Sequence, residues 1–181
     1  STPKPSSAAS DVYKRQSLKS WKPWSRPSLR DEALMASERV SPDALPTPSE
    51  FWTWSTGAYG QRSQDWLHVQ SMGGNVNLAL LLHHLDLLRI PVDLTDLQPA
   101  LVQTEAVLLP WRTLRQQAKS RVGTEEYQTM LAHELELERL QQGVLLQTLR
   151  TLALFRGDSR NLFHYLSLLG AQQGPLRDLI C

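Results

Sequence analysis

Two glutamates four residues apart are the side chains in this sequence best placed to bind a ligand. Glu134 and Glu138 lie in the stretch ELELER, and side chains four residues apart project from one face of a helix. Glu134 also lies near an apolar stripe, so we expect it to be partly buried and to need a partner. Arg112 and Arg115 are the candidate partners, because arginine pairs with a carboxylate through two parallel hydrogen bonds.

Two interpretations of these four side chains stay open. We favour an inter-helix salt-bridge network that stabilises the fold, because ion pairs between packed helices are commonly structural and have no catalytic role. The alternative is a polar pocket around Glu134, Glu138 and Arg112, which binds a small cationic or amide ligand or a substrate. A Glu134→Gln variant that folds normally but loses a ligand or an activity would favour the pocket.

Two asparagines follow the stretch SMGG at the start of an apolar run. Asn75 is well placed to cap a helix, and Asn77 falls in the first helical turn. Amide groups at a helix N-terminus can contact an anion, so both are candidate ligand-binding residues. The stretch lacks the lysine and the spacing of a phosphate-binding loop, and we interpret its glycines as a helix break.

The sequence lacks the spacings of metal sites and of nucleophilic catalysis. Residue types that bind metals are present at His83, His84, Asp86, His133, Glu134 and Glu138. They match neither the Glu-x-x-His pairs of helical carboxylate sites nor a His-Glu-x-x-His site. There is no Gly-x-Ser-x-Gly stretch, and the single cysteine is the last residue, Cys181. We therefore expect no metal, no cofactor and no catalytic residue.

Helical periodicity predicts the elements that must position these residues. The expected helices cover residues 49–60, 63–72, 75–89, 95–109, 110–121, 124–155 and 159–170. The segment from Pro110 either continues the preceding helix or restarts it, since proline is tolerated in a first turn. No segment alternates with the period of a strand. We predict an all-α, single-domain bundle of five to seven helices with one long C-terminal spine helix.

Helix starts are predicted from capping residues, and the central helix from its composition. We expect Ser49, Asn75, Thr95 and Thr124 to be N-caps. The helix after Asn75 is apolar on nearly every side, which indicates a central, buried position. The spine would run for about 31 residues, or about 46 Å.

Five short stretches in this region together resemble a known family. In chain order they are EFWTWSTGAYG, GNVNLALLLHHLD, LLPWR, ELELER and NLFHYLSLLG. They are similar to small proteobacterial proteins of domain-of-unknown-function family 2390, over residues 49–170. The resemblance implies a bacterial source, a helical fold and a cytosolic protein, and it carries no activity over to this chain.

The N-terminal stretch SSAASDVYKRQ, residues 6–16, resembles a laboratory reagent. It is the in-frame translation, without a mismatch, of an adapter used with transposase-based sequencing libraries. We therefore interpret residues 1–16 as an artefact of an assembled environmental read, and tags and scars of this kind are set aside before the fold is considered. Residues 17–48 are expected to be a disordered or extended lead-in, with a natural start at Met35. The helical domain would then cover residues 49–170, and residues 171–181 would be a tail.

The net charge changes sign when these leading residues are set aside. The whole sequence carries a formal charge of +1. Residues 1–16 hold three basic residues and one acidic residue, so the remainder carries −1, and the part from Met35 carries −3. A basic stretch remains at Arg112, Arg115, Lys119 and Arg121, which we interpret as a solvated face because an acidic domain lacks the footprint of a nucleic-acid binder.

These observations favour a non-enzymatic binding or regulatory module in the cytoplasm of a bacterium. A single cysteine fits a reducing compartment, and no apolar run is long enough to span a bilayer. A protein partner or a second copy of the chain is the expected ligand, and nucleic acid is not. The alternatives are an enzyme or small-ligand binder that uses the glutamate–arginine pocket, and an RNA- or ribosome-associated factor.

Overall fold

The computed structural model describes residues 38–170, and within them the chain is helical. The elements are η1 (Pro42–Ala44), α3 (Pro48–Gln61), α4 (Ser63–Ser71), α5 (Val76–Leu87), α6 (Leu94–Ala118), α7 (Thr124–Thr151) and α8 (Asn161–Leu168). The prediction of an all-α bundle is confirmed. The predictions made for residues 1–16, for most of the lead-in and for the tail lie outside the described residues.

The N-cap of helix α3 lies two residues earlier than predicted, at Thr47 and not at Ser49. The Thr47 hydroxyl accepts a hydrogen bond from the Glu50 backbone N–H at 3.3 Å, and the Glu50 carboxylate accepts one from the Thr47 backbone N–H at 2.7 Å. This reciprocal arrangement is a capping box, and Pro48 occupies the first helical position, where no N–H is needed.

Helix α5 is the central helix, as its composition predicts. Its seven buried residues cover almost every side, and the Asn75 side chain caps it by accepting a hydrogen bond from the Leu78 N–H at 2.9 Å. The preceding turn needs glycine at Gly74, because a Cβ there would lie 2.9 Å from the Val69 carbonyl oxygen and 2.6 Å from Leu169 Cδ1. The turn thereby lets α4, α5 and the end of α8 approach closely.

Helix α6 is a single helix of 25 residues, with Pro99 and Pro110 inside it. The prediction of Thr95 as its N-cap is wrong: Asp93 is the cap, and its carboxylate accepts a hydrogen bond from the Thr95 N–H at 2.9 Å. Helix α6 therefore nearly equals α7 in length, so the fold has two long helices where one was expected.

Helix α7 has 28 residues and ends earlier than predicted, at Thr151. The residues after it are extended, because Val40 donates its N–H to the Leu154 carbonyl oxygen and Arg39 forms a β-bridge with Phe155. Gly123 occupies its N-cap position without a side-chain hydrogen bond, so the prediction of Thr124 as the cap is also wrong. The early end of α7 is thus accompanied by pairing with a segment more than 100 residues away, which the local sequence does not encode.

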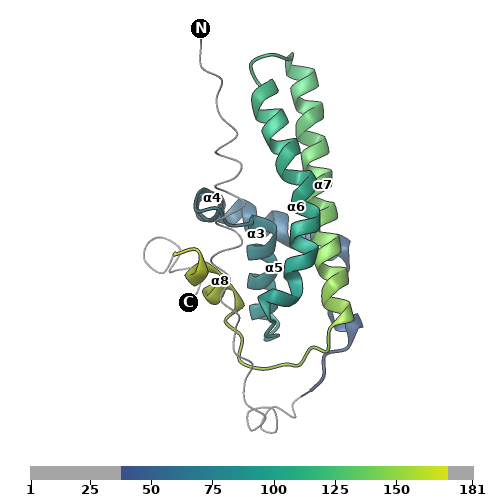
Figure 1. Cartoon of the computed structure of the whole chain (residues 1–181). Coiled ribbons are helices and arrows are strands. Elements are labelled where there is room, and N and C mark those ends of the chain that lie inside the picture. Colours follow the sequence, from purple (N-terminus) through teal and green to yellow (C-terminus); the bar gives the residue numbers. More distant parts are fainter. Residues whose placement is uncertain (1–37, 171–181) are drawn as a thin grey trace.

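The two long helices form an antiparallel hairpin whose outer half extends beyond the other helices (Figure 1). We call residues 106–140, which are the end of α6, the connecting turn and the start of α7, the arm. We call the rest of the described chain the base. The hydrophobic core lies in the base, where α3 and α5 pack against α7, α4 and α8 pack against α5, and the first turns of α6 contribute Leu94, Leu97 and Leu101.

Helix α8 is attached to α5 by a carboxylate of α5 that caps its N-terminus. The Asp86 carboxylate of α5 accepts hydrogen bonds from the backbone N–H groups of Asn161 at 2.8 Å and Leu162 at 3.0 Å. A carboxylate at a helix N-terminus is favoured by the helix dipole and by the unpaired N–H groups there.

Candidate functional site

The predicted glutamate–arginine cluster is present and lies inside the arm. Arg112 donates from Nε to Glu134 Oε1 at 3.2 Å and from Nη2 to Glu138 Oε1. Arg115 donates to both oxygens of Glu134, from Nε to Oε2 and from Nη2 to Oε1 at 3.3 Å. The expected pairing between α6 and α7 is confirmed, and the expectation that Arg112 and Arg115 lie on a solvated face is wrong.

Burial makes this cluster more than a surface ion pair. Glu134 is 8% exposed, which confirms the prediction that its carboxylate is buried. The hydrogen bond to Glu134 raises the pKa of Arg115 despite the opposing effect of burial, and the Tyr127 hydroxyl, 2.6 Å from Arg115 Nη1, contributes in the same direction. Two cations face two anions, so the cluster is neutral as a unit and every carboxylate has an arginine partner.

Trp111, the neighbour of Arg112 on α6, makes a further contact between the two helices of the arm. Its indole Nε1 donates a hydrogen bond to the Met130 carbonyl oxygen at 3.1 Å. Its ring lies against His133, with ring centroids 5.7 Å apart. The indole therefore links α6 and α7 in addition to the ion pairs.

A second polar cluster, made of amides, lies in the base. Gln141 Oε1 accepts hydrogen bonds from Asn75 Nδ2 at 3.1 Å and from Asn77 Nδ2 at 2.9 Å. Gln142 Nε2 donates to Asn77 Oδ1 at 3.0 Å, so four amide side chains from α5 and α7 bond to one another. All four are buried, and buried amides are stable only when their donors and acceptors are matched in this way.

Hydroxyls and one carboxylate complete the amide cluster. Ser55 donates to Gln142 at 3.1 Å, Thr104 accepts from Gln141 at 2.9 Å, and Tyr165 accepts from the Asn75 backbone N–H at 2.7 Å. Glu105 accepts from Asn75 Nδ2 at 2.9 Å. Burial raises the pKa of Glu105, and the hydrogen bond from Asn75 only partly offsets this rise.

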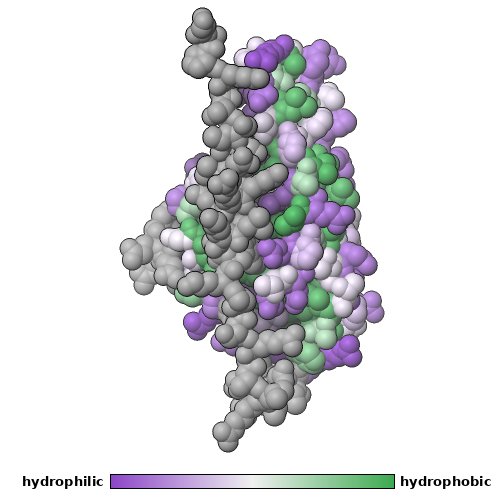
Figure 2. Space-filling view, viewed as in Figure 1, coloured by the Kyte–Doolittle hydropathy of each residue, from purple (hydrophilic) through white to green (hydrophobic). Residues whose placement is uncertain are grey.

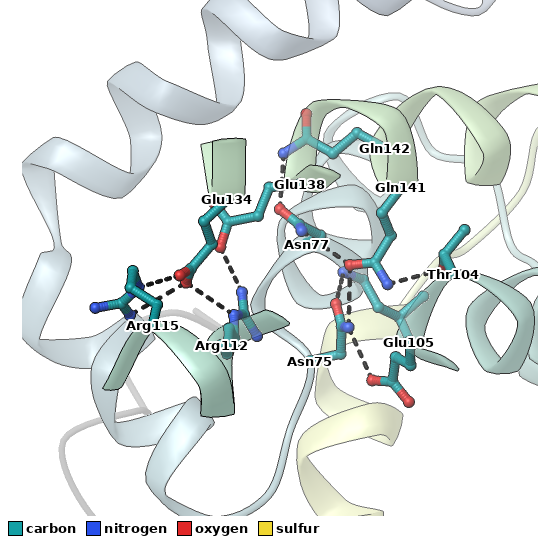
Figure 3. A network of polar contacts seen from close by, with 11 residues as sticks. Asn75, Asn77, Thr104, Glu105, Arg112, Arg115, Glu134, Glu138, Gln141 and Gln142 are labelled. Carbon is teal, nitrogen blue, oxygen red and sulfur yellow. Dashed lines mark hydrogen bonds and ion pairs between the residues drawn. The ribbon is translucent and has the colours of Figure 1, made fainter. Parts of the chain in front are cut away.

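The two clusters lie next to each other along the α6–α7 hairpin, but they are separate (Figure 3). Arg112, Glu134 and Glu138 come together in one, and Asn75 and Asn77 in the other. The five candidate residues therefore do not line one pocket. A cavity of about 140 Å³ lies instead beside α8, and it is lined by Pro91, Val92, Leu94, Asp158, Arg160, Asn161 and His164.

Sequence reasoning missed most of the amide cluster. Gln141 and Gln142 look like surface residues of a long helix, and nothing local distinguishes them from exposed Gln147. The available signal was their distance from the ends of a helix predicted to be the spine, where a polar pair would have to face other helices. The hydroxyls of Ser55 and Thr104 carry no comparable signal.

The histidines of α5 pack against aromatic rings and not against carboxylate ligands. The His84 ring lies 4.3 Å from the Trp54 ring, centroid to centroid, and 5.5 Å from Phe51. Burial lowers the pKa of both His83 and His84. Within residues 38–170, His84 Nδ1 is buried without a hydrogen-bond partner, and no three metal-binding side chains gather there.

The family comparison covers both clusters. Residues 50–145 match the family described as "Protein of unknown function (DUF2390)". The chain belongs to this family. The match runs from the first turn of α3 into the last third of α7, so the DUF2390 region contains all five candidate residues and the whole arm. Neither the curated proteins nor the solved structures include a match to the chain.

Of the helices in the described part of the chain, none combines the length and the apolar character needed to cross a membrane.

Proposed function

We propose that this DUF2390 protein is a non-enzymatic binding or regulatory module that contacts a macromolecular partner through its arm. The observation that carries the proposal is a contrast between buried and exposed groups. The candidate polar residues bond to one another inside the protein, while several large apolar side chains of the arm are exposed.

The exposed apolar residues are the positive support for binding. Val107 and Leu114 of α6 and Leu140 of α7 are each more than half exposed. In Figure 2 hydrophobic residues, in green, are interspersed with hydrophilic ones along the visible face of the arm. Clustered exposed apolar residues are typical of protein interaction sites, whereas isolated ones are common everywhere.

The internal bonding of the polar residues supports a structural role for them. The carboxylate of Glu134 is held by two arginines, and the amides of Asn75 and Asn77 are held by Gln141. A ligand at either place would have to replace these bonds. The proposal includes a cytoplasmic location in a bacterium, which is supported by the single cysteine of the chain.

Site-specific photo-crosslinking tests the proposal. A photoreactive amino acid would replace Leu114 in the arm or Leu87 in the base, which is also exposed, and each adduct would be identified by mass spectrometry. We expect one identified adduct from position 114 and none from position 87. Adducts from the base alone would overturn the proposal, as would a substrate turned over by the wild type and not by a folded Glu134→Gln variant.

A further inference from the structure

Each helix of the arm carries a second apolar stripe, which lies beside the ion-paired residues on the helix surface. Its positions are spaced alternately by three and four residues, which is the spacing of a helix that packs against a straight neighbour. The stripe consists of Val107, Trp111, Leu114 and Ala118 on α6 and of Met130, His133, Leu137 and Leu140 on α7, and it ends just beyond the arm at Val144, which packs against the core of the base. We call these nine residues the outer band.

Contacts between the two helices show that the outer band is one surface. The Trp111 indole bonds to the Met130 carbonyl oxygen and lies against His133, so the α6 stripe meets the α7 stripe directly. On both sides of this contact the band is open: Val107 is 58% exposed and Leu140 is 60% exposed. None of its nine residues is Asp, Glu, Lys or Arg.

The other stripe of each helix is already used inside the arm. Arg112 and Arg115 on α6 face Glu134 and Glu138 on α7. In a four-helix bundle every helix packs against two neighbours and so needs two such stripes. Within the described chain, the arm supplies two helices with two stripes each, and exposed residues of the outer band such as Val107, Leu114 and Leu140 are not covered by a further helix.

We propose that a second copy of this chain packs against the outer band, so that two arms form a four-helix bundle. This inference rests on the proposed binding function and names its partner. A different protein is usually selected by complementary charge, and the band has none to offer. An uncharged, evenly spaced band is complementary to itself, which is what a two-fold interface between identical copies requires.

The estimated area of the outer band is smaller than the area that stable complexes bury. Fifteen residues of α7 span about 21 Å, and two helices side by side are about 20 Å wide, so each copy contributes roughly 400 Å² of flat area. Stable complexes bury about 800 Å² per partner. We therefore expect a weak, concentration-dependent dimer, with dissociation in the micromolar range or above.

Sedimentation velocity on the whole chain, with matched variants, tests this inference. The disruptive variants are Val107→Glu and Leu114→Glu, whose native residues are 58% and 51% exposed. The controls are Val102→Glu and Leu135→Glu, at 56% and 51%, because each lies five helical residues before a band residue and points about 140° away from it. Circular dichroism would establish that all four variants fold.

The expected result is a wild-type dimer that forms between about 5 and 500 µM, the range in which a weak interface of this size is populated. The two band variants should raise its dissociation constant by at least about tenfold, since they bury an unpaired carboxylate, and the two controls should not. A wild type that stays monomeric throughout, or equal effects of band and control variants, would overturn the inference. If photo-crosslinking at position 114 then identified a different protein, the second copy would be ruled out while the proposed function stood.

Discussion

The base and the arm of this molecule use opposite means to hold polar groups between helices. In the base, amides and hydroxyls from five helices bond to one another around Gln141, which is fully buried. In the arm, ions hold two helices together around Glu134, which keeps a small exposed fraction. The cluster in the base is therefore mainly neutral, with Glu105 as a carboxylate at its edge, whereas the cluster in the arm is made of charged groups, of which the Glu138 side chain is 23% exposed.

The difference follows from the cost of removing each kind of group from water. Burying an ion costs several kcal/mol even with a partner, whereas a fully bonded amide costs little. The arm has only two helices and cannot bury its ions completely, so ion pairs are tolerable there. The polar groups of the base are therefore bonded within the base, while the arm still exposes surface that a partner can cover.

Breaking the amide cluster should have the largest effect on stability. In Gln141→Leu, Asn77 Nδ2 loses its acceptor and Asn75 Nδ2 loses one of two, while both stay buried. An unsatisfied buried donor costs about 1–3 kcal/mol, so we expect a loss of about 3 kcal/mol in the free energy of unfolding by urea. Gln147→Leu, at an exposed position of the same helix, should change it by less than about 0.5 kcal/mol. Equal losses would show that the base does not depend on the cluster.

Replacing a glutamate with glutamine should lower the stability of the protein in the arm but should leave it unchanged or raise it in the base. Glu134→Gln leaves Arg112 and Arg115 with one carboxylate between them, and we expect it to destabilise the arm by about 2 kcal/mol. Glu105→Gln keeps an acceptor for Asn75 and removes a charge whose pKa burial has raised, so stability should be unchanged or greater.

Urea unfolding of both variants measures the contrast. An equal loss in the free energy of unfolding for Glu134→Gln and Glu105→Gln would contradict the distinction between a closed base and an ion-paired arm. A folded Glu134→Gln variant with unchanged stability would show that the arginines find other partners in solution.

The structure also shows what the sequence could and could not predict. The Asn75 cap is found from sequence because a cap is a local bond to a residue three positions on. The Arg112–Glu134 pair is found because a charged residue beside an apolar stripe needs a partner. The sequence predicts Thr95 as the N-cap of α6, but Asp93, two residues earlier, has a side chain that can cap a helix equally well. Capping preferences alone therefore do not decide between the two residues.

Long-range contacts account for the rest of the differences. Gln141 is buried because α5 presents Asn75 and Asn77 to it, and no pattern within α7 reveals this. The end of α7 at Thr151 depends on the pairing of the following residues with residues near Arg39. Such contacts are decided by the packing of distant segments, which periodicity and spacing do not describe.

Acid should weaken the base through its two central histidines. Burial lowers the pKa of His83 and His84, so the unfolded chain takes up protons more readily than the folded one. Their stabilising contribution is complete above about pH 6.5 and is lost as the pH falls through the lowered values of the folded state. Nearby Asp86 opposes the shift at His83 and Arg62 adds to it.

The urea midpoint measured between about pH 7.5 and pH 5 should therefore fall, as linkage requires for a group that charges more easily when unfolded. A His84→Phe variant, which keeps a ring against Trp54, should show a smaller fall. An identical pH profile for the variant and the wild type would show that other groups cause the loss.

Substitutions of arginine by glycine should have the smallest effects on stability, one stabilising in the base and one destabilising in the arm. Arg89 ends α5 with φ of +57°, a conformation that favours glycine, so Arg89→Gly should stabilise the base by about 0.5–1 kcal/mol. Arg139→Gly, inside α7 in the arm, should destabilise by about 1 kcal/mol. Thermal unfolding distinguishes the two, and a loss in both would show that the Arg89 side chain stabilises the turn.

If the base is closed and the arm is free to bind, amide hydrogen exchange measured at two protein concentrations should distinguish the two regions. In dilute protein we expect slow exchange in α5 and fast exchange in residues 107–118 and 130–140 of the arm. In concentrated protein the arm should slow by about tenfold or more, because amides in a bound helix exchange only after it opens, while α5 stays unchanged. Slow exchange of the arm at both concentrations, or equal changes in both regions, would contradict the account.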